Sequence, residues 1–157
     1  MNIRLPLALT LLALLLFTLV GCGNSAPATL AVIPIYTDAT ELKPGESAVA
    51  DTLVENMKQN QALTGQLGVN ATIEQKAFTM PAGATWDDVK KFYDENLTSS
   101  GWSSNSMISN VMAQTNAAND QFQLANWQKN KQNLSVIMIA DPTNEGAKML
   151  IVSLASA

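Results

Sequence analysis

The sequence predicts an α+β domain in which two helices pack on a mostly antiparallel sheet of four to five strands. Two segments, 47–63 and 85–98, carry apolar residues at helical spacing. Four others are rich in apolar and β-branched residues and are bounded by turn-forming residues: 69–80, 121–128, 133–140 and 148–154. Three successive strands at the end of the chain favour antiparallel pairing, so we expect a two-layer architecture with helix on sheet.

The first element is an apolar run at the N-terminus. Arg4 precedes an uncharged stretch from Leu5 to Val20, which is short for a membrane-spanning helix of ~20 residues and has the length of a signal-peptide core. The run ends in Leu19-Val20-Gly21-Cys22, which resembles the lipobox of bacterial lipoproteins. This resemblance implies a signal peptide over 1–21, cleavage between Gly21 and Cys22, and acylation of the Cys22 thiol. The alternative is an ordinary signal peptide or a short anchor helix with an incidental cysteine.

Residues 22–29 are small and polar and are expected to form a flexible tether that carries the lipid. A single domain over 30–157 then follows, with order beginning near Leu30. The segment Leu30–Tyr36 is apolar but contains Pro34, which favours an edge strand or an extended path. A turn is expected at 37–40.

The helix over 47–63 is predicted by apolar residues at Val49, Leu53, Val54 and Met57, with Ser47 as its N-cap. A strand over 69–80 follows, because this stretch mixes Thr, Ile, Phe and Ala with polar residues.

The helix over 85–98 is the principal one. Thr85-Trp-Asp-Asp88 is typical of a capping box, with two carboxylates at the positive end of the helix dipole. Its apolar face consists of Trp86, Val89, Phe92 or Tyr93, and Leu97. Gly101 is expected to end the helix in the left-handed conformation, with Trp102 folding back on the last turn.

The stretch 107–113 fits either a helix or an irregular path, and 115–120 is expected to be a loop. Three strands then follow, joined by a hairpin turn at 129–131 and a longer turn at 141–146. Because residues 133–140 are apolar on both faces, that strand is expected to lie centrally in the sheet.

Composition limits the chemistry available to the domain. After residue 21 the chain has eight lysines, thirteen acidic residues and no arginine, so its net charge is 8 − 13 = −5. Nucleic acid is therefore not an expected partner, because it requires clustered cations. The chain has no histidine and a single cysteine, so the folded domain lacks the commonest general base and transition-metal ligand, any disulfide, and any thiol nucleophile.

The segment Pro34-Ile-Tyr-Thr-Asp-Ala39 resembles the proline-x-tyrosine-proline-glycine-alanine entry segment of exported bacterial modules without an assigned function. Trp86-x-x-Val-x-x-Phe-Tyr93, followed by Gly101-Trp102, is similar to the helix of that module. The resemblance covers about 33–154 and implies a helix packed on an antiparallel sheet and a location in the cell envelope. It implies no reaction.

Several residues are candidates for function, and each has a structural alternative. The carboxylates Asp87, Asp88, Asp94 and Glu95 suit acid–base chemistry. Adjacent Asp87 and Asp88 cannot face one point on a helix, however, so dipole capping is the simpler interpretation of these two. Asp141, Asn144 and Glu145 offer oxygen ligands for calcium, although a polar turn is the simpler interpretation. The aromatic residues Trp86, Tyr93, Trp102 and Trp127 suit either a ligand pocket or a core.

Met107 and Met112, together with Trp127, are the residues that we select as a possible binding surface, because no predicted element accounts for the two methionines. No catalytic residue, metal ligand or cofactor is predicted. The function that we expect is a non-catalytic binding or interaction module of the cell envelope, anchored outside the cytoplasm by lipid on Cys22, with an envelope protein as a possible partner. The alternatives are a carboxylate-dependent hydrolase and a small-molecule or solute-binding lipoprotein.

Overall fold

A computed structural model describes residues 27–66, 71–104 and 106–157. Five antiparallel strands form one sheet in the order β1-β2-β5-β4-β3. The strands are β1 (Thr40–Glu41), β2 (Thr72–Thr79), β3 (Phe122–Lys129), β4 (Gln132–Ala140) and β5 (Lys148–Ser156). The helices are η2 (Leu30–Val32, a 3-10 helix), α2 (Ala48–Gln66), α3 (Trp86–Thr98) and α4 (Ser106–Ala118). This arrangement confirms the predicted α+β class.

β4 lies inside the sheet, as predicted, because it pairs with β5 on one side and β3 on the other. Its alternate side chains enter two different cores. Leu134, Val136 and Met138 belong to the larger core, whereas Ile137 and Ile139 belong to the smaller one. Successive side chains of a strand point to opposite faces, so both faces of the sheet are covered.

α3 covers one face of the sheet through the predicted stripe. Trp86, Val89, Tyr93 and Leu97 are buried, and Phe92 packs at the edge of the same core. The Asp88 backbone N–H donates to Thr85 Oγ1 at 3.2 Å, and the Thr85 hydroxyl donates to the Asp88 carboxylate at 2.6 Å. The first bond confirms Thr85 as the N-cap. In the second bond the Asp88 carboxylate binds the Thr85 side chain, whereas in a capping box it would bind the Thr85 backbone N–H.

The end of α3 is also as predicted. Gly101 has φ +80°, a conformation that favours glycine. The Trp102 N–H donates to the Leu97 carbonyl at 3.1 Å, and Trp102 is buried against the last turn.

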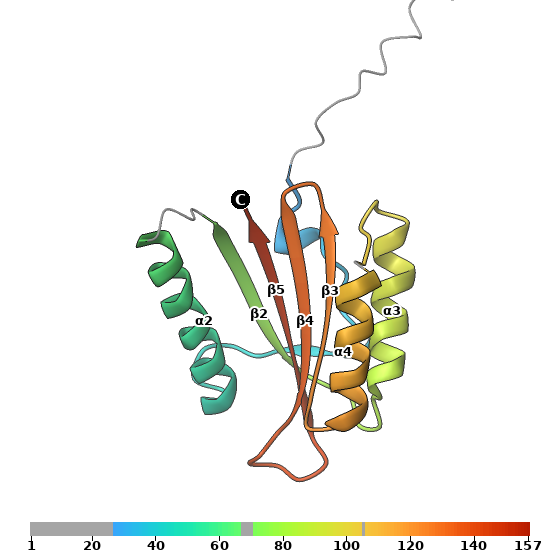
Figure 1. The fold of residues 1–157 in the computed structure, drawn as a ribbon. Helices are drawn as coiled ribbons and strands as arrows, with labels where there is room; N and C mark the ends of the chain where they lie inside the picture. The colour runs from blue at the N-terminus through green and yellow to red at the C-terminus, as the bar shows by residue number, and fades with distance from the viewer. Residues whose placement is uncertain (1–26, 67–70, 105) are drawn as a thin grey trace, which may run out of the picture.

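α2 covers the opposite face, as Figure 1 shows by the positions of α2 and α3 on either side of the sheet. Val49, Ala50 and Leu53 pack against Met149 and Ile151 of β5. Ser47 Oγ accepts the Ala50 N–H at 3.2 Å and donates to the Met149 sulfur at 3.3 Å, so the predicted N-cap also fixes the helix to the sheet.

α4 resolves the ambiguity of 107–113 in favour of a helix, and the predicted loop at 115–120 is wrong for 115–118, which continue that helix. The Asn and Ser content of this stretch suggested an irregular structure, but its polar side chains form hydrogen bonds within the helix and to the sheet. The Thr115 hydroxyl donates to the Val111 carbonyl at 3.1 Å, within the helix. The Asn116 side chain bonds to β3, so α4 lies beside that strand (Figure 1).

The segment Leu30–Tyr36 was expected to be an edge strand or an extended path, and the structure contradicts this for Leu30–Val32, which form the 3-10 turn η2. Ile33 is extended, and residues 34–36 belong to no helix or strand. Leu30 and Ile33, three residues apart, are buried together, whereas Val32 and Ile35 are exposed. The only pairing in this part of the described chain is β1, a two-residue edge strand at the end of the segment predicted to turn.

The ordered chain begins before Leu30, since both backbone polar groups of Ala28 bond to the Gln132 side chain. The predicted signal peptide, the cleavage site at Gly21 and Cys22, and most of the tether lie outside the described residues. Within the described ranges, no helix is both long enough and apolar enough to cross a membrane.

Candidate functional site

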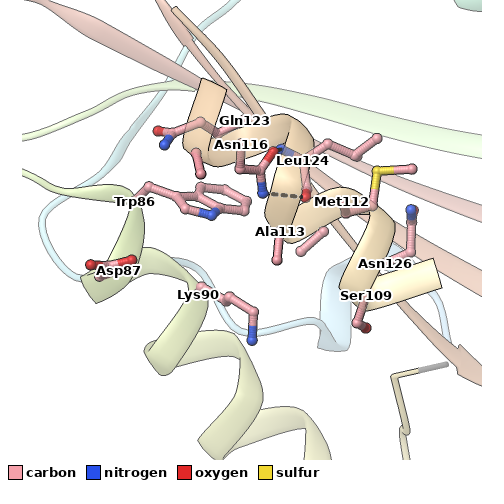
Figure 2. A pocket seen from close by; sticks show the side chains of 12 residues that line it. Trp86, Asp87, Lys90, Ser109, Met112, Ala113, Asn116, Gln123, Leu124 and Asn126 are labelled. Atoms are coloured by element: carbon pink, nitrogen blue, oxygen red, sulfur yellow. Dashed lines mark hydrogen bonds between the residues drawn. The ribbon is translucent and has the colours of Figure 1, made fainter. Parts of the chain in front are cut away.

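A cavity of about 230 Å³ lies where the first half of α3, α4 and β3 meet. Figure 2 shows the Trp86 indole directed from α3 toward α4, where Ala113 and Asn116 lie, with the Met112 side chain on the far side of α4 near Leu124. Twelve residues line the cavity: Trp86, Asp87, Lys90, Ser109, Met112, Ala113, Asn116, Ala117, Gln123, Leu124, Ala125 and Asn126.

The apolar part of the cavity comes from all three elements. Trp86 and Ala125 are buried members of the larger core, so they form a fixed wall. From α4, Ala113 and Ala117 stand one turn apart, and their small side chains leave room between the helix and the sheet. Met112 adds a flexible thioether that can adapt to the shape of a bound group.

α4 is fastened to the edge of the sheet by Asn116. Its side-chain oxygen accepts the Leu124 N–H at 2.9 Å, and its amide nitrogen donates to the Leu124 carbonyl at 3.0 Å (Figure 2). An edge strand presents unpaired backbone groups that invite association with other chains. Asn116 therefore satisfies the edge-facing backbone groups of Leu124 and holds α4 beside β3.

Some polar groups on the rim are already engaged. Lys90 Nζ pairs with one oxygen of Asp94, whose other oxygen accepts the Trp127 indole N–H at 3.0 Å. Asn126 Oδ1 accepts the Ser135 hydroxyl. The bond between Asp94 and Trp127 joins α3 to β3 and gives Asp94 a structural role.

Other polar groups on the rim are free to bind. The side chains of Asp87, Ser109 and Gln123 have no hydrogen-bond partner within the described part of the chain. An apolar wall with a few unengaged polar groups at its margin is typical of sites that bind small groups.

The residues predicted to form a site lie in different parts of the molecule. Met112 lies in the cavity. Met107 belongs to α4, but its side chain lies outside the described residues. Trp127 is only 2% exposed, so its assignment to a binding surface is wrong: this position of β3 faces α3 and the core. Gly21 and Cys22 lie outside the described residues.

The four aromatic residues Trp86, Tyr93, Trp102 and Trp127 are all core residues, of which Trp86 also reaches the cavity. The Tyr93 and Trp127 ring centroids are 5.8 Å apart. The Tyr93 hydroxyl is buried and has no hydrogen-bond partner in the described part of the molecule. Burial raises the pKa of Tyr93, so its hydroxyl stays protonated and cannot act as a base near neutral pH.

A second, more open basin lies at the end of the sheet that carries the β4–β5 loop. Asp87, Asp120, Asp141 and Glu145 border it, together with Lys148. No group of three His, Cys, Asp or Glu side chains among the described residues is close enough to hold a metal ion.

The β4–β5 loop shows how Asp141 is used. Its Oδ1 accepts the Thr143 N–H at 2.8 Å and the Thr143 hydroxyl at 2.6 Å, which is the geometry of a polar turn. These two hydrogen bonds lower the pKa of Asp141. A carboxyl group that acts as a general acid requires a raised pKa instead.

Most of the cavity was not predicted from the sequence, because residues 107–113 fitted either a helix or an irregular path. The signal was present: thirteen residues from Ser106 to Ala118 contain no glycine, proline or charge. That α4 packs on β3, and that Asn116 binds its edge, could not be inferred from spacing.

Comparison with models of protein families, with curated proteins and with solved structures finds no match to this chain.

Proposed function

We propose that this protein is an exported lipoprotein, held to a membrane by lipid on Cys22, and that its folded domain is a non-catalytic binding module. The observation that carries the anchoring is the order of features at the N-terminus: one cation, an uncharged apolar run, and Leu19-Val20-Gly21-Cys22. Two or more acyl chains on one residue supply stable anchoring without a basic patch. The acidic composition of the domain is compatible with that mode of attachment.

The test of anchoring is the Cys22→Ala variant. It should incorporate no labelled palmitate in growing cells, because the acyl chains have no other site of attachment. Asn24→Ala, which leaves the four lipobox residues intact, is the matched control and should be labelled like the unaltered protein. Labelling of Cys22→Ala, or no labelling of the unaltered protein, would contradict the proposal.

The cavity between α3, α4 and β3 supports a binding role for the domain. It combines the Trp86 wall and the two alanines of α4 with the unengaged polar groups of Asp87, Ser109 and Gln123. Such a lining suits an apolar side chain flanked by peptide groups, which is what an envelope protein partner presents.

Catalysis receives less support from the geometry. Asp141, one of the four carboxylates that border the open basin, accepts two hydrogen bonds from Thr143 in its own turn. Lys90 and Asp94 form an ion pair with each other.

The test of the cavity uses N-acetyl-phenylalaninamide, a soluble probe with one apolar side chain and two amide groups. Saturation-transfer NMR should detect its binding to the purified protein. Ala113→Trp should abolish the signal, because the new indole would fill the cavity, whereas Gln114→Trp, one residue along on the exposed side of α4, should not. Equal binding by both variants would contradict the assignment.

A further inference from the structure

The chain enters the domain at a fixed point, at the end of the sheet formed by the β3–β4 hairpin. The Ala28 N–H donates to Gln132 Oε1 at 2.8 Å, and the Ala28 carbonyl accepts from Gln132 Nε2 at 2.7 Å. Gln132 is buried, and its Nε2 also donates to Ser156 Oγ at 2.8 Å, so neighbouring β5 holds the amide in place. The Ala28 backbone is therefore held by the side chain of Gln132, the first residue of β4.

The next residues reinforce this attachment. Leu30 is buried in the larger core, and its N–H donates to the Glu74 carboxylate at 3.1 Å. Figure 1 shows the blue N-terminal segment at the same end of the sheet as the β3–β4 turn and the C-terminus, with the β4–β5 loop at the opposite end.

The distance from this point to the lipidated residue is limited by covalent geometry. Five residues separate Cys22 from Ala28, so the six intervening steps span at most ~20 Å. The nine residues of β4 rise by ~27 Å along the sheet before the β4–β5 loop begins. The hairpin end is thus held near the lipid, and the loop end can lie farther away by the length of the domain.

The two ends also differ in charge. Lys129 and Lys131 flank the hairpin turn, and Lys131 is exposed without an ion pair in the described part of the chain. The neighbouring η2 turn presents Val32, which is 69% exposed. One carboxylate, Glu74, also lies near this end, where it accepts the Leu30 N–H. The opposite end carries one lysine, Lys148, against five acidic side chains: Asp87, Asp88, Asp120, Asp141 and Glu145. A bilayer that contains anionic lipid attracts the first end and repels the second.

We propose that the β3–β4 hairpin end, with Lys131 and the exposed Val32 of η2, faces and contacts the surface of the lipid bilayer, while the β4–β5 loop and the acidic basin point away from it. This orientation rests on the proposed lipid anchor. It assigns the hairpin end to lipid headgroups and leaves the acidic end available to molecules outside the membrane.

The test compares the depth of two matched labels on the lipidated protein. Gln128→Cys places a thiol beside the hairpin, and Asn144→Cys places one in the β4–β5 loop; both positions are exposed and neither side chain makes a hydrogen bond within the described residues. The acylated Cys22 sulfur is a thioether and does not react. Each variant carries a thiol-linked fluorophore in phosphatidylcholine–phosphatidylglycerol vesicles that contain a lipid with a spin-labelled headgroup.

Quenching at position 128 should exceed quenching at position 144 severalfold. Equal quenching, or stronger quenching at 144, in protein that floats with the vesicles would overturn the orientation while leaving the anchor intact. Protein that fails to float with the vesicles would overturn the anchor itself, and the orientation with it. A second pair, Ser100→Cys and Glu145→Cys, samples the same two ends and decides the question if either member of the first pair does not fold.

Discussion

At the scale of single residues, Gln132 connects three parts of the chain that lie far apart in sequence. It is one of two buried polar residues, with Ser153, in the described part of the chain. Its amide bonds to both backbone groups of Ala28 and to the Ser156 hydroxyl. A buried amide is tolerated when its hydrogen bonds are satisfied, and its removal leaves several partners unpaired.

Gln132→Leu should therefore lower the free energy of unfolding by about 2 kcal/mol, because the partly buried Ala28 groups lose their partners. Gln128→Leu replaces an exposed glutamine of the neighbouring strand β3. This substitution should change the free energy of unfolding by less than about 0.5 kcal/mol. Urea unfolding monitored by tryptophan fluorescence provides the measurement. Equal effects of the two substitutions would show that the Gln132 amide does not hold the N-terminal segment.

Tyr93 presents the opposite case, a buried hydroxyl without a partner among the described residues. Tyr93→Phe removes a desolvated polar group and preserves the ring contacts with Phe92 and Trp127. The substitution should leave stability unchanged or raise it by about 1 kcal/mol near neutral pH. A clear loss of stability would show that the hydroxyl has a partner.

The pH dependence of the same residue has a defined sign. Burial raises the pKa of Tyr93 above its unfolded value, so above a pH of about 10 the unfolded chain releases a proton that the folded chain retains. Stability should accordingly decline as the pH rises beyond that value, and the decline should be smaller in Tyr93→Phe. Tyr36, the other tyrosine of the chain, remains in both proteins and makes the comparison specific.

At the scale of elements, α4 and β3 form a unit in which a helix protects the edge of a sheet. The contact is carried by Asn116, whose amide satisfies the N–H and the carbonyl of Leu124. Farther along β3, Ser103 bridges the same edge at Gln128 by two backbone hydrogen bonds of 3.0 and 2.8 Å. Both devices reduce the tendency of the edge to pair with other chains.

Asn116→Leu should destabilise the protein by about 1 to 3 kcal/mol, because the Leu124 backbone groups lose their partners while still covered by the helix. Hydrogen exchange at the Leu124 amide should accelerate more than at the central strand β5. Gln114→Leu, on the exposed side of α4, is the control and should leave that exchange rate unchanged. An unchanged rate in Asn116→Leu would show that the helix does not guard this edge.

The elements that could be predicted from the sequence are those whose own side chains determine them. α3 has a capping threonine, an apolar stripe and a glycine stop, and all three are found in the structure. α4 escaped prediction because Asn116 and Thr115, which resemble loop residues, form tertiary and helical hydrogen bonds. η2 could not be told from an edge strand or an extended path, because apolar residues three apart, such as Leu30 and Ile33, also occur in short extended runs.

At the scale of the whole molecule, the sheet separates two cores. α3 closes the larger core and α2 closes the smaller one on the opposite face. Periodicity predicted both helices but could not assign α2 to a face, because β4 and β5 are apolar on both. The cavity was unpredictable for a related reason, since its lining depends on how α4 sits against β3 and on the small side chains of Ala113 and Ala117.

Export, anchoring and the orientation of the hairpin end all depend on the modification of Cys22. Mass spectrometry of the protein purified from membranes addresses this directly. We predict an N-terminal peptide that begins at Cys22 and carries the mass of a diacylglyceryl group, with residues 1–21 removed. An N-terminal peptide that retains residues 1–21 with a free thiol at Cys22 would contradict the account.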